Sequence, residues 1–344
     1  MLRPTSALAL LLLVPAASEG PRFAPAEGSE LTKRFEVSFE AEIEELSIKM
    51  GQTTLDDYFD DVDLTLSTDL AVDVTDTFRR VADGRPVELI RRFDGIESRT
   101  KLDYVANTVS GEVELELASD LDGRRVRFLE DAEDEDDRIE LLDADETDGD
   151  LVVQGLVEDM DLRALLPDND VERGDSWKVD PSELGTLLLP GGSLHLRPVD
   201  DEDDTLELFQ SLAGIPPAEL AESELEGWIT CTYMGTRERD GIELARIEID
   251  FDVDGRVDLE PLLLRVLDDL WSGSNYALSD AALSIDLTGT GELDWNVEAG
   301  HFQAFEARLD TWASFELNAS GGDGSLEVRA AGSGTATVEA EAGA

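Results

Sequence analysis

The chain has 344 residues, of which 41% are hydrophobic, so it can bury one large core or two smaller ones. It contains 81 acidic and 27 basic residues, which gives a formal net charge of −54. A charge of this sign and size repels nucleic-acid phosphates and anionic lipid surfaces. The composition therefore excludes a nucleic-acid-binding protein.

The first 18 residues have the pattern of a secretory signal. Arg3 supplies the charged start, residues 7–14 are apolar, and residues 15–18 are small cleavage-site residues. We expect an exported protein, periplasmic or extracellular. No later segment reaches the roughly 20 apolar residues of a membrane-spanning helix, so we expect no transmembrane segment. Cys231 is the only cysteine, which rules out an intramolecular disulfide and suits a small core residue.

The rest of the chain is expected to form a flexible lead, residues 19–32, and a single β-rich domain, residues 33–344. In the first β block, residues 33–129, apolar and polar residues alternate, with a change of phase after Ile43 that indicates a bulge. Asp83-Gly84 and Asp94-Gly95 predict two turns. Residues 113–117 are expected to form a hairpin with residues 126–128.

The central part, residues 130–223, is expected to be an acidic loop followed by a helical insert. The acidic run 130–137 and the shorter run 200–204 are typical of solvated loops. Residues 162–166 have a short helical face, and Trp177 and Val179 suit a brief strand. Asp180-Pro181 predicts the start of a small helix that ends at Pro190. Residues 206–212 are expected to be helical as well.

The second β block, residues 224–338, has the longest alternating segments. Residues 225–237 and 245–253 form one expected hairpin. Residues 284–297 and 302–317 form another, which residues 326–338 continue. Residues 259–271 have the spacing of an amphipathic helix. The predicted fold class is α+β and mainly β: a large twisted antiparallel sheet, as a meander or a half-barrel, with short helices packed on one face.

One stretch nearly matches a calcium-binding loop. Its carboxylates alternate before Gly255 as in an EF-hand loop, but the twelfth position, which needs an acidic ligand, is Pro261. The residues before the stretch also alternate like a strand, where an EF-hand has a helix. A strand with an acidic outer face is therefore the favoured interpretation. The candidate metal ligands are Asp250, Asp252, Asp254, Asp258 and Glu260.

No catalytic constellation stands out elsewhere. Gly174-Asp175-Ser176 resembles a hydrolase block but lies mid-chain, without the Asp-x-x-His that should accompany it. His195 and His301 are the only histidines, so a multi-histidine metal site is not expected. Pairs of carboxylates could support glycosidase chemistry, although a chain with this many acids forms such pairs by chance.

Several short motifs resemble those of a family of uncharacterised exported bacterial proteins. The motifs are Val74-Thr-Asp76, Ala82-Asp-Gly-Arg-Pro86, Met160–Pro167, Gly174-Asp-Ser-Trp177 and Gly289–Trp295. They are turns and core aromatics, so the resemblance implies a shared fold and no activity. More loosely, long antiparallel strands with helices inserted mid-chain resemble the half-barrel of periplasmic lipoprotein carriers, whose concave face holds acyl chains.

The leading functional hypothesis is an exported, non-enzymatic binding or scaffold protein without a cofactor. The alternatives are a carboxylate-dependent hydrolase and a carrier of a hydrophobic, acyl-type ligand. A closed core beneath the helices is favoured over a ligand pocket, because large apolar pockets are few per protein. Divalent cations are expected to bind weakly and diffusely at the two acidic runs.

Overall fold

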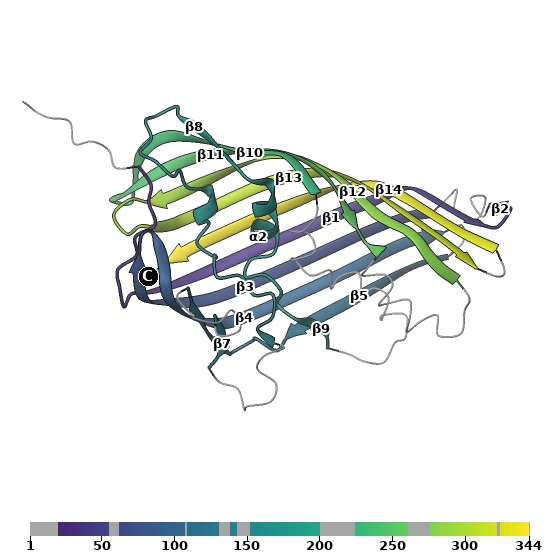
Figure 1. Cartoon of the computed structure of the whole chain (residues 1–344), viewed down its shortest axis with the longest axis horizontal. Helices are drawn as coiled ribbons and strands as arrows, with labels where there is room; N and C mark the ends of the chain where they lie inside the picture. The colour runs from purple at the N-terminus through teal and green to yellow at the C-terminus, as the bar shows by residue number, and fades with distance from the viewer. Residues whose placement is uncertain are drawn as a thin grey trace, which may run out of the picture.

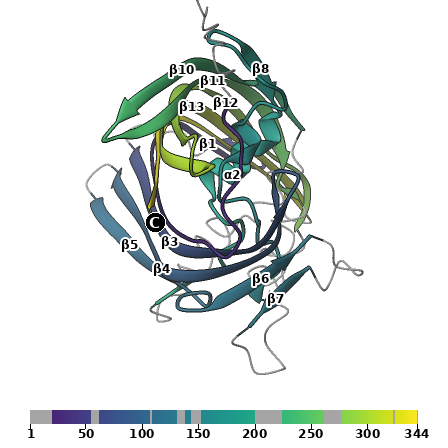
Figure 2. The same cartoon turned by 90° about the vertical axis from the view of Figure 1, so that its left-hand side faces the viewer.

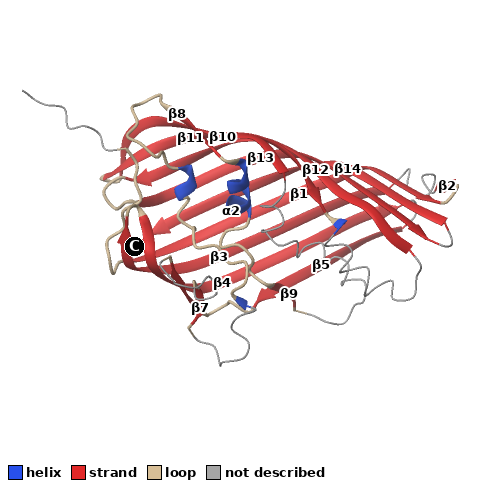
Figure 3. Ribbon diagram, in the orientation of Figure 1, coloured by secondary structure: helices blue, strands red, loops and turns tan. Residues whose placement is uncertain are grey.

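The computed structural model describes residues 20–54, 62–106, 109–130, 138–142, 152–199, 224–260, 276–321 and 324–343. Most of these residues lie in one large antiparallel sheet of very long strands (Figures 1 and 3). The described residues form only one regular α-helix of any length, together with two 3-10 turns. The predicted mainly β fold is therefore confirmed. Within these residues, no helix has the length and apolar character needed to cross a bilayer.

The strands of the sheet form two blocks with a short-stranded insert between them. The first block contains β1 (Glu30–Met50), β2 (Thr53–Thr54), β3 (Val62–Ala82), β4 (Arg85–Ala106), β5 (Val109–Ser119), β6 (Arg125–Leu129) and β7 (Ile139–Leu141). The insert contains η3 (Arg163–Leu165), β8 (Ser176–Val179), η4 (Pro181–Glu183), α2 (Leu184–Leu188) and β9 (Leu196–Pro198). The second block contains β10 (Glu224–Arg239), β11 (Ile242–Asp258), β12 (Tyr276–Asn296), β13 (His301–Gly321) and β14 (Gly324–Gly343).

Most neighbours in the sheet are also neighbours in the chain, as the alternating segments predicted. The order is β7-β6-β4-β3-β1-β14-β13-β12-β11-β10-β8, so the sheet is an open one whose two blocks are joined at the centre by the pairing of β1 with β14. Along each long strand one face is buried and the other exposed near the insert, because successive side chains point to opposite faces. The predicted bulge after Ile43 is present between Ile43 and Glu45.

The sheet is strongly curved and its concave face surrounds the insert (Figure 2). Glycines at inward positions allow neighbouring backbones to come close. A Cβ at Gly332 would lie 2.1 Å from the carbonyl oxygen of Glu42, and one at Gly289 would lie 2.3 Å from that of Arg308. Glycines of this kind permit the local bending that a curved sheet requires.

Two predictions in the first block are wrong. Residues 113–117 do not pair with residues 126–128: β5 pairs with residues 98–106 of β4, and β6 pairs with residues 88–92 of the same strand. Asp94-Gly95 is no turn, because both residues lie inside β4 at an irregularity opposite Asp73 and Val74. A single 22-residue strand thus serves two shorter partners, one on each side of the irregularity.

The chain before the predicted start of the fold has defined contacts. Phe23 is 5% exposed and belongs to the core, and the indole nitrogen of Trp295 donates a hydrogen bond of 3.1 Å to the carbonyl of Arg22. β1 begins at Glu30, so the boundary predicted at Lys33 lies inside a strand. The part of the lead that the structure describes is therefore fastened to the fold.

The insert follows its predicted local structure closely. Asp180 caps the small helix by accepting a 3.0 Å hydrogen bond from the backbone N–H of Ser182, and Pro181 occupies the first turn. Backbone contacts join two distant parts of the insert. Leu156 and Gly192 form a β-bridge, the N–H of Val157 donates to the carbonyl of Gly191, and the N–H of Ser193 donates to the carbonyl of Gly155. We call residues 156–192 the plug, and these backbone contacts the clasp.

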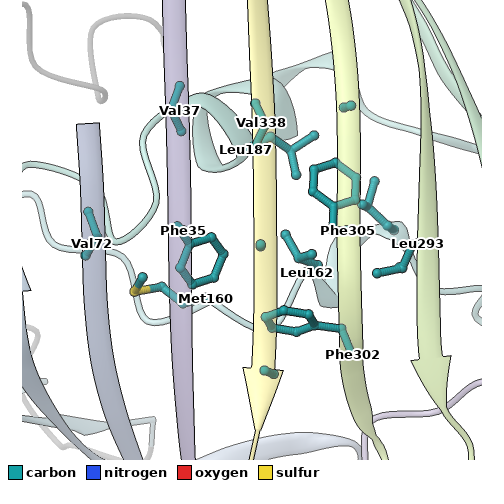
Figure 4. Close-up of a cluster of buried hydrophobic side chains, with 14 of the residues drawn as sticks. Phe35, Val37, Val72, Met160, Leu162, Leu187, Leu293, Phe302, Phe305 and Val338 are labelled. Atoms are coloured by element: carbon teal, nitrogen blue, oxygen red, sulfur yellow. The ribbon is translucent and has the colours of Figure 1, made fainter. Parts of the chain in front are cut away.

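The plug packs on the concave face and completes the main hydrophobic core. Figure 4 shows Met160, Leu162 and Leu187 of the plug against side chains of five strands. The strand residues labelled there are Phe35, Val37, Val72, Leu293, Phe302, Phe305 and Val338. Where the plug covers the sheet, the closed core predicted from the sequence is present.

Several predictions fall outside the described residues. These are the secretory signal, the helix at 206–212, the acidic runs 131–137 and 200–204, and the helix at 259–271 beyond Glu260. A second, smaller apolar cluster is described near the start of that last segment. It is built on Val257, Leu259, Ala281, Leu317 and Ala319.

The outer face should make the fold sensitive to salt. Glu36, Glu339, Glu306 and Glu292 stand directly opposite one another across four adjacent strands. Like charges in this position repel, and salt screens them over about 10 Å at 0.1 M. We expect the melting temperature to rise from low to molar NaCl, and the rise to be smaller in Glu306→Gln. A flat or falling melting temperature in calorimetry would contradict this.

Candidate functional site: the concave face

A network of buried charges lies between the sheet and the plug. Asp76 on β3 accepts two hydrogen bonds of 2.8 Å from Arg91 on β4 and one of 2.7 Å from Lys33 on β1. Asp161 of the plug lies 2.6 Å from the same lysine. All four side chains are 0% exposed. Arg91 also donates to two plug carbonyls, those of Val157 (3.1 Å) and Glu158 (2.8 Å).

The pKa values of the two carboxyl groups in the network are shifted in opposite directions. Burial would raise the pKa of Asp76, but the positive charges of Arg91 and Lys33 outweigh burial and lower that pKa to about 2. Burial raises the pKa of Asp161, and the charge of Lys33 opposes this rise without cancelling it. Asp161 is close to Lys33, yet neither of its oxygens accepts a well-directed hydrogen bond. Asp161 is thus the less well stabilised anion.

Other plug charges continue the network towards solvent. Arg163 forms ion pairs with Glu158 and, at 3.1 Å, with Asp159, and its guanidinium lies 5.2 Å from the ring centre of Phe23. Burial raises the pKa of Glu158 to about 7, although Arg163 opposes the shift. One oxygen of Glu158 is buried without a hydrogen-bond partner. A cleft of about 1230 Å³ borders these residues and the lead.

Beyond the plug the concave face stays apolar but is less deeply buried. Six inward-facing residues on three adjacent strands are half-buried and belong to neither hydrophobic cluster. We call them the distal patch: Ala41, Ile43, Leu64, Leu66, Leu102 and Tyr104. Register makes them contiguous, because Leu66 stands opposite both Ala41 and Leu102, and Leu64 opposite Ile43 and Tyr104. On the other side of β1 the patch borders Gly332 and Gly334.

The predicted calcium ligands lie on and just after a strand. Four of them are exposed on the outer face of β11: Asp250, Asp252, Asp254 and Asp258. The backbone N–H of Glu260 donates a hydrogen bond of 2.9 Å to the carboxylate of Asp258. Alternate residues of an extended strand lie about 7 Å apart, so this backbone does not wrap around one ion as an EF-hand loop does. Among the described residues no group of three His, Cys, Asp or Glu side chains is placed to hold a metal.

The cysteine and the histidines occupy structural positions. Cys231 is buried on β10, and burial raises the pKa of its thiol to about 12, which favours the inert core residue predicted from the sequence. His301 begins β13, its Nδ1 lies 2.6 Å from the carbonyl of Phe302, and burial lowers its pKa. His195 lies 2.9 Å from the carbonyl of Gln154, close to the clasp.

Comparisons with known proteins identify no family. No family model matches the chain, and no curated protein matches it. One similar solved structure is titled "Crystal Structure of Pseudomonas aeruginosa OccK7 (OpdD)". It is 8% identical, with 90% of this chain and 98% of that chain covered, and its TM-score is 0.17. A likeness of this size carries no argument about fold or function.

Proposed function

We propose that the protein is an exported, non-enzymatic binding protein that carries an apolar, acyl-type ligand on the distal part of its concave face. The observation that carries this proposal is the distal patch. It is apolar, contiguous and inward-facing, yet it lies outside both clusters that bury the other core residues. A hydrophobic ligand would remove this surface from water at about 25 cal/mol per Å².

The dimensions of the sheet suit an elongated ligand. β1, β3, β12 and β13 each have 21 residues, which corresponds to about 70 Å at 3.3 Å per residue. The main cluster extends along β1 only to Phe39, which leaves roughly half of the strand beyond the plug. The glycines beside the distal patch add depth, because they place no side chain on the concave face.

The loose likeness to lipoprotein-carrier half-barrels supports the same proposal, because those proteins also hold acyl chains against a curved sheet. Export is proposed from the N-terminal sequence, as periplasmic or extracellular. A carboxylate-dependent hydrolase has less support. Two of the described carboxyl groups with strongly shifted pKa values, Asp76 and Asp161, are buried in ion pairs between sheet and plug, where a substrate has no access.

Ligand binding can be tested with two adjacent substitutions. Leu66 faces inward and Ser67 faces outward on β3, so the same new charge is placed on opposite faces of the sheet. We expect Leu66→Asp to weaken binding of a fluorescent fatty acid by at least about tenfold, which corresponds to 1.4 kcal/mol, because a buried unpaired carboxylate opposes an apolar ligand. Ser67→Asp should bind as the unmodified protein does.

Native mass spectrometry of the protein purified from its own cells provides the second measurement. A stoichiometric lipid is expected to co-purify, and less of it with Leu66→Asp. Circular dichroism must show the same β content in both variants. No co-purifying lipid and no saturable fatty-acid binding, or equal affinities in the two variants, would refute the carrier proposal.

A further inference from the structure

Two threonines interrupt the apolar phase of the concave face at the border between the closed core and the distal patch. Thr68 on β3 and Thr100 on β4 stand directly opposite each other. They face inward, because each lies two residues from a member of the distal patch on its own strand, Leu66 or Leu102. Their hydroxyl oxygens lie 3.2 Å apart and form one hydrogen bond. Both side chains are half-buried, and we call them the threonine pair.

The threonine pair lies where the main hydrophobic cluster ends. Thr68 stands opposite Phe39, the last residue of β1 that packs against that cluster. One inward position closer to the plug, Ser98 stands opposite Leu70, and both are only 7% exposed. One inward position farther from the plug, the half-buried Leu66 begins the distal patch. A ligand that lies on the distal patch therefore meets the threonine pair at the closed end of its site.

The threonine pair keeps a hydrogen-bond donor that the protein does not use. Each hydroxyl has one hydrogen and two lone pairs, and the bond between the two hydroxyls uses one hydrogen and one lone pair. Within the part of the chain that the structure describes, neither hydroxyl has a further partner. One hydroxyl hydrogen is therefore free to bond an acceptor on a ligand. Polar residues in the apolar phase of a strand are unfavourable unless they have a function.

A third hydroxyl lies on the concave face across β1 from the threonine pair. Thr311 on β13 follows the inward phase of Leu309, and Gly334 on β14 stands opposite both Thr311 and Ala41. A Cβ at Gly334 would lie 3.1 Å from the hydroxyl oxygen of Thr311. This oxygen therefore lies beside the bare backbone of the glycine, on the same face as the distal patch. The polar groups on this part of the concave face are hydroxyls on both sides of Gly334.

This part of the concave face has no charged group for a ligand. Among the described residues, the inward positions of β1, β3, β4, β13 and β14 beyond the level of Phe39 are all uncharged. The nearest inward cation on β1 is Lys33, about 20 Å before Phe39, and it is paired with Asp76 and Asp161. The chain has a net charge of −54. A carboxylate or phosphate bound here would lose its hydration without gaining a counter-ion, which is costly.

We propose that the carried ligand is a neutral acyl compound, an ester or an amide, whose carbonyl oxygen accepts a hydrogen bond from the threonine pair while its chain lies along the distal patch. From Thr68 to the start of β3 at Val62 the strand runs about 20 Å, which accommodates an extended acyl chain. An ester or amide carbonyl accepts hydrogen bonds and has no charge to desolvate. This inference rests on the carrier proposal and adds the chemical class and the orientation of the ligand.

Three probes with the same pyrene-labelled chain test the class of ligand. They are the fatty acid, its methyl ester and the alkane of the same length. Fluorescence titration of the unmodified protein at pH 8 gives the three dissociation constants. We expect the ester to bind at least about tenfold more tightly than the acid, because the acid is ionised at this pH and the site has no cation for it.

A double variant tests the hydrogen bond itself. Thr68→Val with Thr100→Val keeps the shape of both side chains and removes both hydroxyls. It should weaken binding of the ester about fivefold, as expected for one lost hydrogen bond, and change binding of the alkane by less than about twofold. Thr68→Ser with Thr100→Ser keeps both hydroxyls and should keep the affinity for the ester. Thr65→Val is the matched control, because Thr65 lies in the outward phase of β3, and it should bind every probe as the unmodified protein does.

The possible outcomes separate this inference from the carrier proposal. If none of the three probes binds saturably, the carrier proposal itself is wrong. If the probes bind but the acid binds as tightly as the ester, the carrier proposal stands and the neutral class of ligand is wrong. The same holds if the valine variant leaves the affinity for the ester unchanged, or weakens ester and alkane equally, because a merely structural role of the threonine pair predicts equal losses. The comparison of acid and ester uses the unmodified protein, so it decides the class even if a variant does not fold.

Discussion

Asp76→Asn is expected to lower the free energy of unfolding by about 3–5 kcal/mol, the range typical of removing one partner from a buried ion pair. Asp76 accepts hydrogen bonds from both Lys33 and Arg91, and all three side chains are 0% exposed. Asparagine would remove the one carboxylate that accepts hydrogen bonds from both cations. Urea unfolding at pH 7 measures the loss, which is a large share of the 5–15 kcal/mol of a typical domain.

Asp73→Asn is the matched control, because Asp73 lies on the same strand, faces outward, and pairs with Arg34 at 3.1 Å on the surface. Its cost should stay within about 1 kcal/mol. The pKa of Asp76 is lowered, so its stabilisation is complete above pH 3.8 and is lost as the pH falls through about 2. The difference between unmodified protein and Asp76→Asn should therefore narrow between pH 4 and 2. Equal costs for the two variants at pH 7 would contradict the role given to the network.

Phe302→Ala is expected to cost about 3–5 kcal/mol, because it removes a fully buried ring from the contact between sheet and plug. Phe302 is 0% exposed, its ring centre lies 5.9 Å from that of Phe35, and Figure 4 places it near Leu162 of the plug. Chemical denaturation gives the free energy directly. This substitution tests whether the plugged end has the tight, closed core that the sequence predicts.

Trp312→Ala supplies the comparison on the same strand. Trp312 is 44% exposed, so its removal should change the unfolding free energy by no more than about 0.5 kcal/mol. A cost below about 1.5 kcal/mol for Phe302→Ala would mean that the plug packs loosely and that its cavity collapses. In that case the ligand site would extend from the distal patch towards the clasp, into the region described here as closed core.

Local pattern was sufficient to predict most of the hairpins. The β12–β13 and β10–β11 pairs were predictable because a period of two marks each strand and a glycine turn joins them, with Asp240 and Gly241 at positive φ. The prediction of a hairpin between residues 113–117 and 126–128 was wrong because strands that are adjacent in the chain need not pair. β4 is long enough to pair with both segments. The turn predicted at Asp94-Gly95 divided this strand in two, so its length was not predicted.

The charged network was missed although the sequence contains a signal for it. Lys33 occupies an inward position between Leu31 and Phe35, Arg91 lies between Leu89 and Phe93, and Asp76 follows Val74. A charged residue in the apolar phase of a strand needs a buried partner, so the position of each of the three by itself indicates a buried ion pair. Their partners could not be named, because one residue of register decides which side chains stand opposite.

The sequence by itself determined the strands, their inward faces, the bulge after Ile43 and the capped helix of the plug, because each depends on neighbours a few residues away. Tertiary structure alone decided that β1 pairs with β14, that β4 has two partners, and that Asp161 meets Lys33 across 128 residues of chain. It also decided where the plug ends on the concave face, and so which inward residues form the distal patch. These outcomes depend on the register and curvature of the whole sheet, which no local pattern contains.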